Sequence, residues 1–500
     1  MAASALAGTP ENPLRVAIVG AGPAGFYAAD HLLKQEDVVV SVDMFDRLLS
    51  PYGLVRHGVA PDHLKIKTVT KGFSQTAMHP RFRFFGNVDF GRDLTIDDLK
   101  GLYHQAVFCT GAQTDRRMGI PGEDLEGSHP ATSFVAWYNG HPDYRDCRFD
   151  LSQESVAIVG VGNVAIDVAR ILCLSPEELR ATDMPDYAVN ALSKSRVRDV
   201  YLLGRRGPAQ AAFTNPELKE LGELADADVD IPHSEAELDP LSREELEASG
   251  DRMLARKVEM IREYASRPPG GKPRRLHLRF LVSPVELQDT GQGRVGGLRL
   301  VHNVLVRTAS GALSAEATGE SETIPAGLVF RSVGYRGVSL AGVPFNERWG
   351  VIANAGGRVL DAESESPVVG EYAAGWIKRG PSGVIGTNKP DALETVTAML
   401  EDARAGLTWQ PSSASPEAVT SVFADRCVDF TTFQDWCAID ALELAEGERC
   451  GRPRVKCGSR DEMWRALGRV DGRAALMVGS VACNRRAIDA AGTTRTTGYS

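Results

Sequence analysis

The stretch RVAIVGAGPAGFYAADHLL (residues 15–33) decides the fold of this chain. A short run of β-branched residues comes first, a glycine turn follows, and apolar residues then recur at helical spacing. Gly20, Gly22 and Gly25 stand in G-x-G-x-x-G spacing at this turn. In such a unit the first glycine permits the turn, the second lets the main chain approach a pyrophosphate, and the third lets helix and strand pack closely. The stretch therefore predicts a Rossmann-type nucleotide-binding unit.

The same pattern returns in SVAIVGVGNVAIDVARILC (residues 155–173). Gly160, Gly162 and Ala165 fill the three positions there, and alanine is an accepted variant at the third. Two such openings predict an α/β chain with two Rossmann-type domains, each built on a three-layer sheet. They also predict two separate dinucleotides.

The residues after the next predicted strand differ between the two units. Asp46 follows VVVSVDMF (38–45), and an acid at this place binds a ribose 2′-hydroxyl and repels a 2′-phosphate. Arg205 and Arg206 follow VRDVYLLG (197–204), and guanidinium groups suit a phosphate. FAD on the first loop and NADP(H) on the second satisfy both patterns. The pairing predicts a reductase in which NADPH gives a hydride to the flavin.

Composition excludes several other classes of protein. The 500 residues carry a net charge of −10, which argues against a nucleic-acid partner. The eight cysteines include no C-x-x-C pair, so we expect neither a disulfide redox centre nor a metal site. No run approaches the ~20 apolar residues of a membrane span. The first 14 residues lack a basic segment followed by an apolar one, so we expect a cytoplasmic protein.

Six colinear segments between residues 15 and 469 together resemble the adrenodoxin reductase family, including its bacterial FprA-type NADPH–ferredoxin reductases. These segments are VGAGPAGFYAADHLL, PYGLVRHGVAPDH, FFGNVDFGRD, GVGNVAIDVARIL, LLGRRGPAQAAFTNPELKEL and GWIKRGPSGVIGTNKPDA. The resemblance implies a ferredoxin–NADP+ reductase of the adrenodoxin reductase type. Such an enzyme passes single electrons from its FAD to a small acidic [2Fe-2S] ferredoxin, with cytochrome P450 systems as one outlet.

The resemblance also implies the residues of the cofactor and active sites. Besides the first glycine loop, it implies FAD contacts at Ala24, Asp46, Leu54, Val88, Trp376, Gly383, Val384 and Ile385. It implies NADP contacts at Val161, Gly162, Asn163, Val164, Arg205, Arg206 and Glu217, with Gly383 near the nicotinamide. In the active site it implies that His63 lies near Glu220 and Asp167 and that the three shape the nicotinamide pocket.

We expect the NADP domain (116–337) to be inserted between the two parts of the FAD domain, 1–115 and 338–469. We expect a monomer and a partly disordered tail at 470–500. The ferredoxin would meet a basic patch through charge complementarity. The densest basic candidates are Arg252, Arg256, Lys257, Arg262, Lys272, Arg274 and Arg275.

Each competing interpretation conflicts with a feature of the sequence. A flavin disulfide reductase needs a redox cysteine pair near the flavin. A glutamate synthase small subunit needs a cysteine-rich iron–sulfur domain ahead of the FAD loop, which here begins near residue 15. The GRRGP and GWIKRGPSGV segments argue against a flavin monooxygenase. A non-catalytic FAD-binding regulatory protein would not need a second nucleotide loop with an arginine pair.

Overall fold

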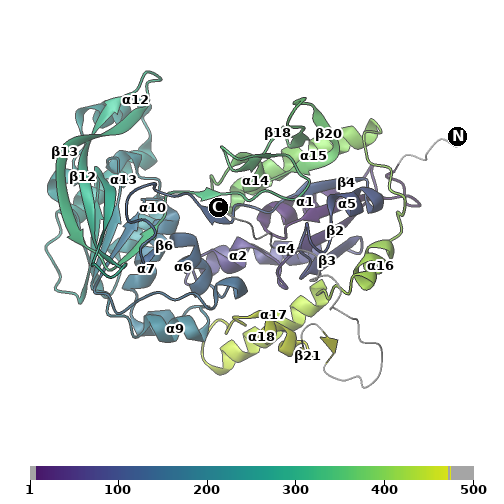
Figure 1. The fold of residues 1–500 in the computed structure, drawn as a ribbon, viewed down its shortest axis with the longest axis horizontal. Helices are drawn as coiled ribbons and strands as arrows, with labels where there is room; N and C mark the ends of the chain where they lie inside the picture. The colour runs from purple at the N-terminus through teal and green to yellow at the C-terminus, as the bar shows by residue number, and fades with distance from the viewer. Residues whose placement is uncertain (1–6, 471–472, 475–500) are drawn as a thin grey trace, which may run out of the picture.

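The computed structural model describes residues 7–470 and 473–474 and places them in two α/β lobes (Figure 1). Two short antiparallel strands, β5 (Thr114–Asp115) and β15 (Tyr335–Arg336), connect the lobes. The first lobe comprises residues 7–113 and 337–470, and the second comprises residues 116–334. This connection lies close to residues 115 and 337, where the sequence places the domain boundaries, and the division into domains stays a prediction.

The sheet of the first lobe has the strand order β18-β19-β20-β4-β1-β2-β3. Five of its strands are parallel, and β18 and β19 form an antiparallel edge. The strands are β1 (Leu14–Val19), β2 (Val40–Asp46), β3 (Phe82–Gly86), β4 (Gln105–Phe108), β18 (Asn354–Ala355), β19 (Arg358–Leu360) and β20 (Pro367–Ala373).

Both faces of this sheet are covered, as alternate residues of β1 show. Val16 and Ile18 pack with helices α1 (Pro23–Leu33) and α15 (Asn388–Arg404). Ala17 and Val19 belong to a second core with α5 (Ile96–Leu102) and α16 (Ala418–Asp425). A strand buried on both faces is uniformly apolar, which explains why this run of sequence carries no polar alternation.

The second lobe holds a six-stranded parallel sheet of order β6-β14-β7-β8-β10-β9. Its strands are β6 (Ser128–Pro130), β7 (Ser155–Val159), β8 (Asp199–Leu203), β9 (Ala227–Asp230), β10 (Arg274–Arg279) and β14 (Leu328–Arg331). One face carries helices α6 (Ala131–Tyr138), α7 (Asn163–Cys173), α10 (Asn215–Gly222) and α13 (Arg252–Ala265).

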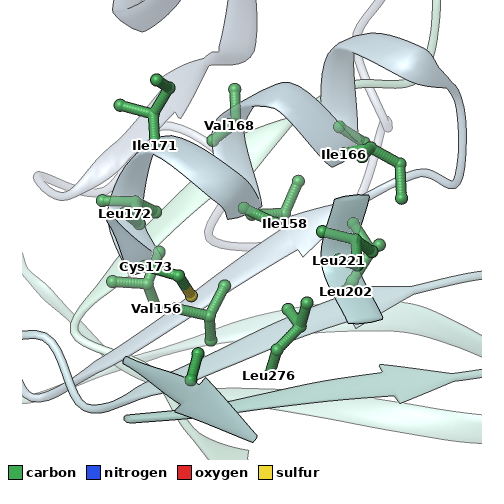
Figure 2. Packing of buried hydrophobic residues seen from close by; sticks show 14 of the residues in the cluster. Val156, Ile158, Ile166, Val168, Ile171, Leu172, Cys173, Leu202, Leu221 and Leu276 are labelled. Carbon is green, nitrogen blue, oxygen red and sulfur yellow. The ribbon is translucent and has the colours of Figure 1, made fainter. Parts of the chain in front are cut away.

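Figure 2 shows side chains of this core, with Val156 and Ile158 of β7 packed below Ile166 and Ile171 of α7. The opposite face is covered by an antiparallel sheet rather than by helices. That sheet consists of β11 (Val282–Asp289), β12 (Val295–Arg307) and β13 (Leu313–Pro325). The predicted three-layer, doubly Rossmann-type architecture is therefore confirmed.

The C-terminal part of the first lobe, with α17 (Phe433–Arg449) and α18 (Arg460–Ala466), lies along both lobes (Figure 1). Glu443 of α17 is fully buried and accepts two hydrogen bonds from Arg56, on α2 (Leu54–His57) of the first lobe. Lys456 Nζ lies 3.1 Å from Asp183 Oδ1 in the second lobe. These buried ionic contacts fix the C-terminal segment against both lobes.

Two expectations about single segments need revision. Strand β13 (Leu313–Pro325) is absent from the sequence prediction, because nine of its thirteen residues are exposed and no apolar alternation marks it. The glycine- and proline-rich stretch RPPGGKPRR (267–275) is typical of a loop, but β10 already begins at Arg274. The expected disorder of the tail lies almost wholly outside the described residues.

Candidate active site between two nucleotide-binding loops

The three glycines of the first loop meet different surroundings. Gly20 has φ +108°, and a Cβ there would lie 2.6 Å from the carbonyl oxygen of Cys109. A Cβ on Gly25 would lie 2.2 Å from Gly20 O. A Cβ on Gly22 would meet nothing within 4 Å. The fold itself therefore requires the first and third glycines, whereas the second faces open space at the N-terminus of α1, where a pyrophosphate would fit.

The second loop repeats this division. Gly160 has φ +125°, and a Cβ there would lie 2.2 Å from Ser332 O. Gly162 faces open space in the same sense as Gly22, at the N-terminus of α7. Ala165, in the third position, is fully buried against the core. Both loops thus have the form that a dinucleotide needs.

Asp46 ends β2 beside the first loop. Its Oδ2 accepts a hydrogen bond from Ala21 N (2.8 Å) and its Oδ1 accepts one from Leu48 N (2.9 Å). Burial raises the pKa of Asp46, and the two amide donors oppose that rise. The carboxylate is therefore held in one orientation, as a ribose acceptor should be.

The other residues that the family resemblance implies for FAD are spread over three segments of the first lobe. Leu54 begins α2 and is 40% exposed, and Val384 is 57% exposed, so both leave apolar surface for a large planar cofactor to cover. Gly383 and Ile385 flank Val384. Val88 differs, because its side chain is buried in the core and only its main chain is left to contact a cofactor.

Arg205 and Arg206 follow β8 directly, one residue after its end. Neither forms an ion pair with any residue that the structure describes. Burial and the neighbouring charge of Arg205 lower the pKa of Arg206. Two adjacent unpaired guanidinium groups form a receptor for a doubly charged anion, which is the chemistry of a 2′-phosphate.

Asn163, Val164 and Glu217 complete this region. Asn163 Oδ1 accepts a hydrogen bond from Thr214 N (3.0 Å), and its Nδ2 donates to Glu217 Oε1 (3.3 Å). Glu217 Oε2 is buried and has no hydrogen-bond partner among the described residues. A ribose hydroxyl would satisfy this oxygen, since a buried carboxylate oxygen without a donor is costly. Val161 and Val164 border the loop and are half-buried.

Trp376 begins the short helix α14 (Trp376–Arg379) next to the connecting strands. Its Nε1 donates to Ser382 O (3.1 Å), and its ring centroid lies 5.4 Å from that of Tyr335 on β15. A cavity of about 470 Å3 opens beside this helix, with Arg116, Tyr335, Trp349 and Arg379 among its lining residues. The sequence prediction did not include Arg116 or Tyr335.

The three predicted active-site residues meet where the lobes face each other. His63 immediately precedes α3 (Leu64–Lys67) in the first lobe, and its Nε2 lies 2.8 Å from Glu220 Oε2 on α10. Its Nδ1 lies 4.0 Å from Asp167 Oδ1 on α7. The structure therefore brings together residues from three separate segments. Their catalytic role stays a prediction.

Burial and neighbouring charges shift the pKa values of these groups in opposite directions. Burial alone would lower the pKa of His63, but the Glu220 hydrogen bond and the charges of Asp167 and Asp62 outweigh it and raise the pKa. Burial raises the pKa of Asp167 to about 6. Burial opposes ionisation of Glu220 as well, but His63 and Arg170 lower its pKa. The His63–Glu220 contact thus favours the charged forms of both residues, and it lies beside an acid, Asp167, whose pKa is raised to about 6.

Arg170 and Asp62 also belong to this cluster, and the sequence prediction missed both. Arg170 is buried on α7, one turn after Asp167, and Asp62 directly precedes His63. The spacing of Asp167 and Arg170, three apart on one helix, was the available signal for an ion pair.

The seven basic residues proposed for docking are mostly neutralised within the second lobe. Four of the arginines pair with carboxylates, both lysines donate to main-chain carbonyls, and Arg252 has no ion partner among described residues. The ion pairs are Arg256–Glu259, Arg262–Glu237, Arg274–Asp226 and Arg275–Asp199, and the lysine contacts are Lys257–Ala211 and Lys272–Leu224. This face is therefore less positive than the sequence indicated, and its docking role stays a prediction.

Comparison with known proteins agrees with this geometry. The family described as pyridine nucleotide-disulphide oxidoreductase matches residues 14–202. NADPH-ferredoxin reductase FprA of Mycobacterium tuberculosis is 45% identical over 462 residues, which cover 91% of this chain and 99% of that protein. The chain belongs to the FprA family of NADPH-ferredoxin reductases.

Other relatives are similar over nearly the same length. The mitochondrial NADPH:adrenodoxin oxidoreductase of Arabidopsis thaliana is 40% identical, with 89% of this chain and 93% of that protein covered. A solved structure of Mycobacterium tuberculosis FprA in complex with NADPH matches with a TM-score of 0.85 at 44% identity, over 91% of this chain and all of that one. Among the described residues, no helix is long and apolar enough to cross a membrane.

Proposed function

We propose that this chain is an NADPH-dependent flavoprotein reductase that passes electrons to a small acidic [2Fe-2S] ferredoxin. Relatives named for NADPH and for ferredoxin or adrenodoxin support this activity, because they match nearly the full length of both chains. FAD and NADP(H) are the cofactors. We infer a monomer, since one chain carries both nucleotide loops, and we infer that it acts in the cytoplasm.

The observation that carries the proposal is the contrast between two similar loops. Each loop leaves open space at its second glycine, Gly22 or Gly162. Asp46 stands beside the first, where it suits a free ribose, and Arg205 with Arg206 stands beside the second, where the pair suits a 2′-phosphate. When bound, FAD supplies the conversion of a two-electron donor into one-electron transfers.

The chain's own residues bind and orient the reactants. The arginine pair would select NADPH over NADH, and Glu217 would hold a ribose through its unpartnered oxygen. His63, Glu220 and Asp167 would shape the nicotinamide pocket where the lobes meet. Hydride transfer needs no general base, so the charged pair would act on orientation and on the local electrostatic field.

A coupled assay tests the proposal. The purified protein should release one FAD per chain, and NADPH should support cytochrome c reduction only when a [2Fe-2S] ferredoxin is added. The rate should fall as salt is raised, because docking by complementary charge is screened. Ferredoxin-independent reduction, or a preparation without flavin, would contradict the proposed function.

A further inference from the structure

Arg170 forms an extensive set of contacts where the two lobes meet. Its side chain is only 4% exposed. Nε and Nη2 donate to the two oxygens of Asp62 (2.8 and 3.0 Å), and Nη2 also donates to Asp167 Oδ1 (2.9 Å). Nη1 donates to Glu220 Oε2 (2.8 Å). Four of the five N–H donors of a guanidinium are thus engaged by three carboxylates.

These contacts hold His63 from two directions. Glu220 Oε2 is the same oxygen that lies 2.8 Å from His63 Nε2, so Arg170 and His63 share it. Asp62 is the residue that directly precedes His63, so the fork on Asp62 also restrains the main chain that carries the imidazole. Arg170 and Glu220 belong to the second lobe, whereas Asp62 and His63 belong to the first.

The charged surroundings of His63 come from every element packed around it. Asp62 precedes α3, Asp167 and Arg170 lie on α7, and Glu220 lies on α10. The phenols of Tyr138 on α6 and Tyr335 on β15 also interact electrostatically with Asp167; Tyr138 is buried and Tyr335 is partly buried. Within this group Arg170 is the permanently charged cation, and all three carboxylates contact its planar guanidinium group.

We propose that Arg170 is a positioning residue that fixes the Glu220 carboxylate against His63 and ties Glu220 to the first lobe through Asp62. This inference rests on the proposed function for its meaning in hydride transfer, but its geometry is independent of it. Lysine would keep the charge and lose the fork, because an ammonium group offers three donors without a plane. Charge and positioning can therefore be separated by substitution.

The test is an NMR pH titration of the imidazole signal of His63 in the FAD-bound protein, with the signal assigned by its absence in H63Q. In the wild-type background E220Q should lower the pKa of His63 by about one unit, because it removes the opposite charge. R170K should lower it as well, although no charge is lost. In the R170K background E220Q should add little, since Arg170 acts through Glu220.

Arg279 provides a matched control in the same lobe. It forks onto Glu235 and Glu322 and contacts neither His63 nor Glu220. R279K should alter thermal stability and leave the titration of His63 unchanged. If R170K does not fold, R170Q takes its place as the second background for E220Q. The prediction concerns how much E220Q changes the pKa of His63 in each background.

Two results would overturn the proposal: a wild-type titration of His63 in R170K, or an equally large E220Q effect with and without Arg170. The readout needs no NADPH. A wild-type protein whose flavin is not reduced by NADPH would contradict the proposed function. The titration would still decide whether Arg170 positions Glu220.

Discussion

His63 Nε2 lies 2.8 Å from Glu220 Oε2, although 157 positions separate the two residues and they belong to different lobes. The contact joins the two lobes beside α7, the helix that follows the second nucleotide loop. Because the folded-state pKa of His63 is raised above 6.5, the charged pair contributes stability below the unfolded pKa and loses it as the pH rises through the folded value.

This pair predicts a pH dependence of flavin reduction by NADPH. The rate should titrate with a midpoint above 6.5, where His63 loses its proton, and H63Q should abolish that step. Stopped-flow rates over a pH series measure both. A midpoint that is unchanged in H63Q would assign the titration to another group, with Asp167, at a pKa of about 6, as the next candidate.

The arginine pair predicts the preference for NADPH. R205L combined with R206L should reduce the NADPH-to-NADH ratio of kcat/KM roughly a hundredfold or more, since each charged contact contributes about 1.5–3 kcal/mol. Arg198, exposed just before the opposite end of β8, gives a matched control, and R198L should leave the ratio unchanged. A double variant that keeps the wild-type ratio would show that Arg205 and Arg206 do not bind the 2′-phosphate.

The second glycines predict loss of ligand without loss of fold. G22A adds a methyl group to open space, so the protein should fold normally and bind FAD weakly. G162A should retain FAD and weaken NADPH binding. G25A is the contrast, because its Cβ would clash with Gly20 O and the chain should fold poorly. Flavin content and NADPH titration separate these outcomes, and a G22A protein with full FAD would contradict the assignment.

The buried Arg56–Glu443 pair predicts a large effect on stability. E443Q should cost about 3–5 kcal/mol, because it leaves the buried Arg56 without its counterion and leaves Arg454 with Asp440 alone. Burial opposes ionisation of Glu443, but the two arginines lower its pKa, so its contribution is present above the unfolded pKa and lost as the pH falls through the folded value.

Denaturant unfolding of the wild type and E443Q at several pH values checks that prediction. The control is E446Q, one turn later on α17, where the Arg449–Glu446 pair is exposed and should contribute little. Equal stabilities of E443Q and E446Q would show that the C-terminal segment is not held as described.

The sequence predicted the fold well where local pattern and packing agree. The strand–glycine–helix units at Gly20 and Gly160 specify their own geometry, and the double burial of β1 and β7 shows in uniformly apolar runs. Strand β13 was not predicted, because its register comes from pairing with β12 while most of its own side chains are exposed. Its sequence therefore resembles a loop.

The site was predicted in part for the same reason. The residues of each loop are local in sequence, and the resemblance to a family supplied His63, Glu220 and Asp167. Arg170 and Asp62 were missed because their pairing spans 108 positions and only the folded chain brings them together. The positive charge of the proposed docking patch was overstated. A sequence shows each arginine but not the carboxylate that neutralises it, as Glu237 does for Arg262.

The central claim is that electrons pass from NADPH to FAD and then to a ferredoxin, and sequential mixing without oxygen tests it most directly. NADPH should bleach the flavin absorbance far faster than NADH does at equal concentration. Oxidised [2Fe-2S] ferredoxin, added next, should restore that absorbance as it becomes reduced. A flavin that NADPH leaves oxidised, or a reduced flavin that ferredoxin cannot reoxidise, would contradict the account.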